Sequence, residues 1–165
     1  KPEELYRRPV DADVAAFLGE ANLLEGKVEG GGVVSTCLGR LVLQEGASSG
    51  WGSPGVEATV LVRPEQIEAR TRNAVPAGGG IPAHVDERSF FGHDAVLRVH
   101  TVGRDQAAGL LVRGTGPGAP APGTDVLLVV RGQVMAWPAS ARDGWASRPR
   151  AVPGPASNRA SAEAG

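Results

Sequence analysis

The stretch Val60-Leu-Val-Arg63-Pro64-Glu65-Gln66-Ile67 is typical of a buried strand that runs directly into a turn. Pro64 has a fixed φ and no backbone N–H, so it suits the first position of a turn that leaves a strand. Glu65 can accept hydrogen bonds from the free N–H groups of that turn, and Arg63 can pair with a carboxylate. We expect a structural role for these residues, with Arg63 at an interdomain or dimer contact as the functional alternative.

Short strands joined by turns are expected on both sides of this stretch. Leu41 and Leu43 alternate with Val42 and Gln44, and in residues 97–100 apolar Leu and Val alternate with Arg and His. This period of two is typical of half-buried strands. Residues 126–130 are continuously apolar and predict a central strand, and Arg131-Gly132 then predicts a tight hairpin. The expected strands are 24–29, 33–38, 40–45, 56–63, 81–89, 95–102, 109–113, 125–130 and 133–137. Because closed barrels leave no free strand edges, we expect a mainly β fold of one or two small OB-like barrels.

Two short helices are expected before the strands. Residues 2–8 begin with a proline and two glutamates, which favour a first helical turn. Asp11 can cap a second helix, whose apolar positions Val14, Phe17 and Leu18 lie on one face. A helix of this kind can cover the end of a barrel.

Composition divides the rest of the chain. Segments rich in Gly, Pro, Ser and Ala are expected to be loops, and they lie at 47–55, 71–80 and 114–123. The middle loop divides the β region 24–138 into possible halves, 24–70 and 81–138. Residues 139–165 contain few large apolar groups and cannot offset the entropy of ordering, so we expect a disordered tail.

Several function classes are disfavoured by composition. A net charge of −1 and 4% aromatic residues argue against a nucleic-acid binder. No apolar run approaches the length of a membrane span, so direct membrane insertion is not expected. The lysines are Lys1 and Lys27, and neither follows a glycine-rich loop as a phosphate-binding loop requires. We therefore expect no ATP hydrolysis by this chain alone, no catalytic residues and, with the single Cys37, no internal disulfide.

The histidines, the glycine runs and the adjacent phenylalanines are the remaining candidates for a binding site. His84, His93 and His100 do not have a recognised zinc spacing, so no metal site is expected. The glycine runs at 30–32 and 78–80 could bind anions through backbone N–H groups, but turns are the better interpretation. Of the adjacent rings Phe90 and Phe91, we expect one in the core and one at a partner contact.

Three segments, in this order and spacing, resemble the C-terminal TOBE-type regulatory region of the ATP-binding subunit of bacterial ABC importers. The resemblance is strongest to the ferric-iron type, and polyamine importers share the architecture. The segments are residues 14–24, a short helix with a glycine stop at Gly19; the strand-to-turn stretch 60–67; and Ser89-Phe90-Phe91-Gly92-His93-Asp94. The interface or structural residues implied by the resemblance are Phe17, Asn22, Arg63, Pro64, Glu65, Phe90, Phe91, Gly92, His93 and Asp94.

The resemblance implies a chain without its nucleotide-binding domain, with residues 1–23 as the helical seam to that domain. The expected partners are an ABC nucleotide-binding domain, a second copy in a homodimer and, through the parent protein, the membrane subunits. No cofactor is expected in this fragment, because Mg-ATP would bind the missing domain of a translocating ATPase. The expected location is cytoplasmic, peripheral to the inner membrane. The alternative is a stand-alone module that binds small oxyanions such as molybdate.

Overall fold

The computed structural model describes residues 3–4, 8–9, 11–12, 14, 19–74, 76, 79–103, 109–139 and 151–152. These residues form a mainly β protein of two curled sheets with short 3-10 turns between strands. None of the helical segments among them has the length and hydrophobicity that crossing a bilayer requires. The predicted mainly β fold is confirmed.

The first sheet is antiparallel and curls into a barrel. Its strands, in spatial order, are β10 (Met135–Pro138), β4 (Glu57–Val62), β1 (Ala21–Gly30), β2 (Val33–Thr36) and β3 (Gly39–Val42). A parallel bridge between Leu43 and Val134 brings the end of β3 back to the start of β10. The short β11 (Ala151–Val152) pairs with the first residues of β1.

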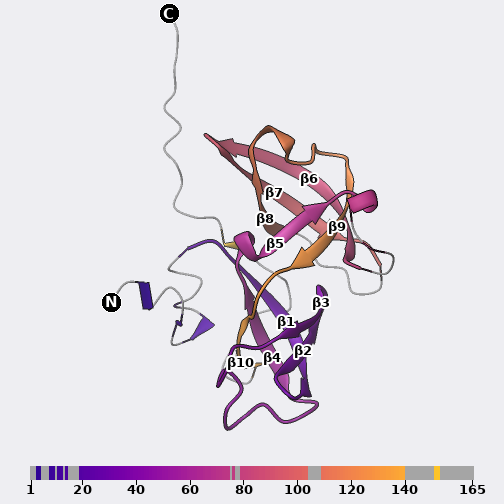
Figure 1. The fold of residues 1–165 in the computed structure, drawn as a ribbon. Helices are drawn as coiled ribbons and strands as arrows, with labels where there is room; N and C mark the ends of the chain where they lie inside the picture. Colours follow the sequence, from indigo (N-terminus) through magenta and orange to yellow (C-terminus); the bar gives the residue numbers. More distant parts are fainter. Residues whose placement is uncertain are drawn as a thin grey trace, which may run out of the picture.

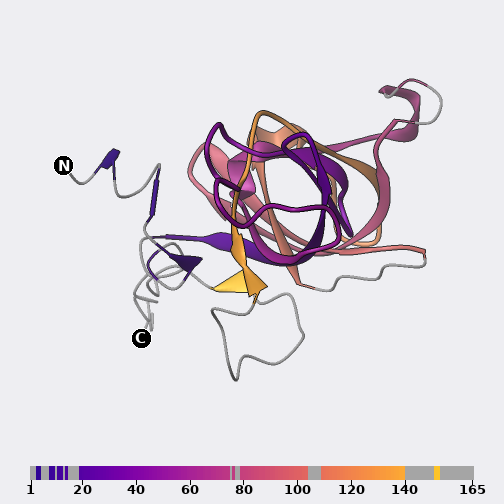
Figure 2. The ribbon, with the colours of Figure 1, turned by 90° about the horizontal axis from the view of Figure 1, so that it is seen from below.

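The second sheet is also antiparallel. Its strands, in spatial order, are β5 (Ile67–Arg70), β9 (Asp125–Val130), β6 (Ile81–Phe91), β7 (Asp94–Thr101) and β8 (Leu110–Thr115). The edge strands β5 and β8 lie against each other, so this sheet also wraps around a centre. Figure 1 shows the two sheets end to end, and Figure 2 shows the strands winding around a common centre.

The chain crosses between the sheets twice, which corrects the predicted halves. The 3-10 turn η1 (Pro64–Gln66) carries the chain from β4 to β5, and residues 131–134 carry it back from β9 to β10. Strand β5 therefore belongs with residues 81–130, and β10 belongs with the first sheet. The halves 24–70 and 81–138 do not match this pairing, because apolar alternation marks strands without specifying their neighbours.

The two ends of the chain differ from expectation in detail. Val14 N donates a hydrogen bond to Asp11 Oδ1 at 2.7 Å, so the predicted cap is present. Phe17 lies outside the described residues. Strand β1 begins at Ala21, so the helical seam predicted for 1–23 does not include its last three residues. In the predicted disordered tail, 151–152 form strand β11, and 140–150 and 153–165 lie outside the described residues.

One continuous hydrophobic core runs through both sheets. It includes Leu24 and Val60 from the first sheet and Leu97 and Leu128 from the second, all at most 2% exposed. Ile67, just after the first crossing, is 1% exposed and belongs to the same cluster. The two sheets are therefore packed as one body rather than joined by a free linker.

Gly26 on β1 offers a test of the first sheet's packing. A Cβ there would lie 2.8 Å from both Val34 Cγ2 and Val60 Cγ2, which is closer than real contacts allow. We expect Gly26→Ala to lower the free energy of unfolding by about 1–3 kcal/mol through overpacking, measured by urea denaturation. The control is Gly118→Ala, where a Cβ meets nothing within 4 Å. Equal stability of the two variants would contradict the packing described.

Candidate functional site

The junction between the sheets brings together several residues that are distant in sequence. Gln66 is central to it, because its side chain bonds both crossings of the chain. Gln66 Oε1 accepts a hydrogen bond from Arg63 N at 3.1 Å. Gln66 Nε2 donates to Arg131 O at 3.2 Å and to Gln133 O at 2.9 Å. The side chain thereby fixes the turn after β4 to the segment that enters β10.

Gln66 was not among the predicted site residues, although the sequence contains a signal for it. A glutamine in the third position of a proline-started helical turn can reach back to the backbone N–H that precedes the turn. Gln66 does this to Arg63. Its two bonds to residues 131 and 133 could not be predicted, because they depend on the crossing of the chain.

Replacing Gln66 tests the importance of these bonds. We expect Gln66→Ala to lower the free energy of unfolding by about 1–3 kcal/mol, because partners at the junction lose their hydrogen bonds. Gln133→Ala is the matched control, since the Gln133 side chain is exposed and Gln66 bonds the backbone carbonyl of Gln133, which alanine keeps. Thermal melting of both variants measures the effect. If the two variants melted alike, Gln66 would not hold the junction.

Asn22 joins the two sheets directly. It is 1% exposed and lies on β1. Its Nδ2 donates to Leu111 O at 2.8 Å, and its Oδ1 accepts from Leu111 N at 2.8 Å. The amide therefore satisfies both backbone groups of a β8 residue, as a neighbouring strand would. The predicted structural residue Asn22 lies at an internal seam between the sheets.

The predicted turn at Pro64 is present. Strand β4 ends at Val62, and Pro64 is buried at the first position of η1, while Glu65 is exposed. Arg63 is 6% exposed, and its Nη1 donates to Glu20 O at 3.3 Å. Arg63 thus ties the turn to the residue before β1.

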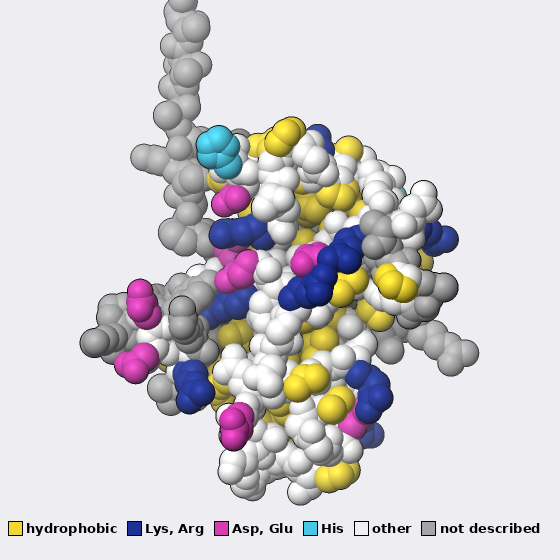
Figure 3. Space-filling model, in the orientation of Figure 1, with side chains coloured by type: hydrophobic (Ala, Val, Ile, Leu, Met, Phe, Trp, Pro, Cys, Tyr) yellow, Lys and Arg dark blue, Asp and Glu magenta, His cyan; other side chains and the backbone are white. Residues whose placement is uncertain are grey.

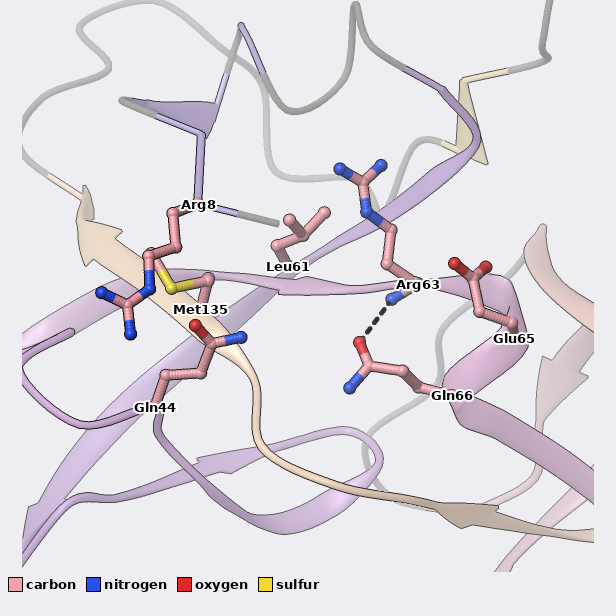
Figure 4. Close-up of a pocket in the computed structure, with 7 residues that line it drawn as sticks. All are labelled: Arg8, Gln44, Leu61, Arg63, Glu65, Gln66 and Met135. Carbon is pink, nitrogen blue, oxygen red and sulfur yellow. Dashed lines mark hydrogen bonds between the residues drawn. The ribbon is translucent and has the colours of Figure 1, made fainter. Parts of the chain in front are cut away.

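A hollow of about 420 Å³ opens beside this turn (Figure 4). Its apolar lining comes from Leu61 and Met135, and the remaining lining is polar or charged: Arg8, Gln44, Arg63, Glu65 and Gln66. In Figure 4 the Arg63 guanidinium and the Gln66 amide extend in different directions from the turn. Arginine and glutamine side chains provide hydrogen-bond donors, which suit a carboxylate or another oxyanion.

Charged pairs continue the junction on the surface. Glu68 on β5 accepts hydrogen bonds from Arg70 Nε at 2.8 Å and from Arg131 Nε at 3.1 Å. The hydrogen bond from Arg70, followed by that from Arg131, holds the pKa of Glu68 below its usual value. Figure 3 shows acidic and basic side chains interspersed along this face. The side chains of these pairs are partly exposed to solvent, so the pairs contribute little stability.

The remaining predicted residues lie on the β6–β7 hairpin. Phe90 and Phe91 end β6, Gly92 has the left-handed φ of 66° that the turn requires, and Asp94 begins β7 opposite Phe91. In Figure 1 this tip projects at the end of the second sheet away from the first. The structure therefore separates Phe90–Asp94 from Arg63–Glu65, giving two regions rather than one.

The expectation that one phenylalanine ring enters the core is wrong. Phe90 and Phe91 are each 53% exposed, because the hairpin extends past the core and neither face of its tip is covered. The Arg88 guanidinium lies 4.7 Å from the centroid of the Phe90 ring and donates to Ala119 O at 2.8 Å. A cation over its face orients this exposed ring.

The described ranges contain no metal centre with three or more protein ligands. Within them, no group of three or more His, Cys, Asp or Glu side chains is arranged to hold an ion. Cys37 is partly buried beside the core and is not in a disulfide.

The TOBE domain family matches residues 60–136, from within β4 to the start of β10. This part of the chain is a TOBE domain. Its match contains the first crossing, the second sheet with its hairpin tip, and the second crossing. Strands β1 to β3 precede the matched residues and complete the first sheet around the ends of the TOBE domain.

Several relatives of this chain are ATP-binding proteins of importers. The Fe(3+) ions import ATP-binding protein FbpC 1 of Rhodococcus jostii is 32% identical over 84% of this chain and 37% of its own length. FbpC of Pseudomonas fluorescens is 34% identical over 79% of this chain and 35% of its own length. The spermidine/putrescine import ATP-binding protein PotA 1 of Pseudomonas aeruginosa is 31% identical over 59% of this chain and 26% of its own length. The chain thus spans just over a third of the two iron-import relatives.

A solved structure supports the OB-like fold. The cytoplasmic molybdate-binding protein ModG, with molybdate bound, superposes with a TM-score of 0.55. The superposition covers 70% of this chain and 94% of ModG, at 16% sequence identity. The likeness is one of fold.

Proposed function

We propose that this chain is the regulatory and dimerisation region of the ATP-binding subunit of an ABC importer, and that the imported solute is ferric iron. The observation that carries the proposal is its similarity to Fe(3+) import ATP-binding proteins over about four fifths of its length. The similarity to a spermidine/putrescine importer supports the importer class more firmly than the solute. The chain itself has no phosphate-binding loop, so ATP hydrolysis belongs to a separate nucleotide-binding domain.

The fold suits a rigid module that transmits the movement of one binding partner to another. Both sheets share one core, and Asn22 and Gln66 fix their junction, so the module moves as one body. Partners in this role are the nucleotide-binding domain, a second copy of the subunit and, through the subunit, the membrane components on the cytoplasmic side. The exposed tip at Phe90 and Phe91 has the aromatic character that such contacts use.

The alternative function is a stand-alone module for small oxyanions. The fold of ModG supports it, as do the arginine and glutamine donors that line the hollow beside η1. An anion bound there would add stability by mass action on the folded chain.

A chimera tests the importer proposal. In FbpC of Pseudomonas fluorescens, this chain replaces the region that it matches, and iron uptake is measured in cells lacking the native protein. We expect uptake to be restored in part, because the module would again support pairing of the ATPase subunits. The comparison protein lacks the region altogether. A folded chimera that performs no better than this truncated protein would contradict the proposal.

A further inference from the structure

Two histidines lie side by side on the outward face of the second sheet, apart from the junction. His84 on β6 and His100 on β7 are direct cross-strand partners. Their ring centroids lie 5.4 Å apart, with the ring planes inclined by 44°. The residues on either side of each histidine in the strand are buried, so the alternation of the strands turns both imidazoles toward solvent. Their side chains are 34% and 40% exposed.

Each imidazole is oriented by an aspartate. His84 Nδ1 lies 2.9 Å from Oδ1 of Asp125, its cross-strand partner on β9. His100 Nδ1 lies 2.8 Å and 2.9 Å from the two carboxylate oxygens of Asp86. The hydrogen bond from His84 is the main cause that lowers the pKa of Asp125. An ionised carboxylate can only accept, so each histidine donates from Nδ1, and in the neutral ring Nε2 keeps its lone pair.

This arrangement matches the way proteins prepare histidine ligands. A metal-bound histidine commonly donates its other ring N–H to a carboxylate, which fixes the tautomer and the ring orientation. With metal–nitrogen bonds of about 2.0–2.1 Å, two imidazoles on one tetrahedral ion have centroids about 5 Å apart. The observed separation of 5.4 Å is close to that value.

We propose that His84 and His100 bind one divalent transition-metal ion through Nε2, with Asp86 and Asp125 as the carboxylates that orient the rings. Imidazole ligands favour Zn²⁺, Ni²⁺ and Cu²⁺ over Mg²⁺ and Ca²⁺. Two protein ligands leave the other positions of the ion to water, in keeping with the lack of a third such ligand in the described ranges. The proposal is independent of the importer function.

Titration calorimetry with Zn²⁺, on the tag-free chain, tests the site. We expect one ion per chain, and Mg²⁺ should give no heat of binding. His84→Gln and His100→Gln should each weaken Zn²⁺ binding at least about tenfold, because a single histidine remains. Asp86→Ala should weaken it by about 10-fold or more through loss of the orienting carboxylate.

The chain has three histidines and one cysteine, so the third histidine and the cysteine can each be replaced as a control for Zn²⁺ binding elsewhere. His93→Gln removes the histidine of the hairpin tip, and Cys37→Ser removes the thiol. Both variants should bind Zn²⁺ as the unchanged chain does, and melting curves confirm that all variants are folded. Failure of the unchanged chain to bind Zn²⁺ would overturn the proposal. So would binding that survives in folded His84→Gln and His100→Gln, or that is lost in folded His93→Gln or Cys37→Ser.

Discussion

Replacing Asn22 with alanine is expected to lower the free energy of unfolding by about 2–5 kcal/mol. The Asn22 amide bonds both the N–H and the C=O of buried Leu111, each at 2.8 Å. Truncating the amide leaves both backbone groups without a partner in a site that water does not reach, and each such group costs about 1–3 kcal/mol. Urea denaturation of the chain measures the change.

Two further variants make the Asn22 result specific. Asn73→Ala removes an exposed asparagine from the turn after β5 and should leave stability within about 0.5 kcal/mol of the unchanged chain. Asn22→Asp keeps the acceptor for Leu111 N–H but removes the donor to Leu111 O, so it should also destabilise. If Asn22→Ala were as stable as Asn73→Ala, the amide would not join the sheets.

Replacing both Phe90 and Phe91 with serine is expected to weaken binding to a protein partner by at least about 30-fold, which corresponds to about 2 kcal/mol. The stability of the chain itself should change little, because both rings are half exposed beyond the core. The separation of the two effects is the test: affinity falls while the melting temperature stays near that of the unchanged chain. The readout is sedimentation with the nucleotide-binding domain and with a second copy of the chain.

Val42→Ser is the matched control for the hairpin tip. Val42 is 50% exposed, but it lies on β3 of the first sheet, away from the tip. Loss of a similarly exposed apolar side chain there should leave partner binding unchanged. If Val42→Ser weakened partner binding as much as the double replacement of Phe90 and Phe91, the hairpin tip would not be a specific contact.

Much of the fold could be predicted from the sequence because the signals were local. The alternation of apolar and polar side chains at residues 97–100 predicts strand β7, and Pro64 predicts the end of β4. Asp11 was expected to cap a helix, and Val14 N bonds its carboxylate. Each of these depends on residues within a few positions of one another, where periodicity and capping are informative.

The site was less predictable because its geometry depends on distant partners. Asn22 was a candidate by resemblance, but its partner Leu111 is 89 residues away and bonds through backbone atoms that carry no sequence signal. Gln66 reaches residues 131 and 133 only because β10 returns to the first sheet. The exposure of both Phe90 and Phe91 follows from how far the hairpin extends past the core, which the pleat alone does not determine.

The most direct test of the central proposal is binding of this chain to the nucleotide-binding domain of FbpC from Pseudomonas fluorescens, measured by sedimentation velocity. A parallel melting series adds molybdate, tungstate, sulfate or phosphate to the chain alone. A regulatory region should bind the domain or a second copy of itself, with no large change in melting temperature from any oxyanion. No binding to the domain and no self-association, together with a large rise in melting temperature on adding an oxyanion, would contradict the proposal and favour the anion-binding module.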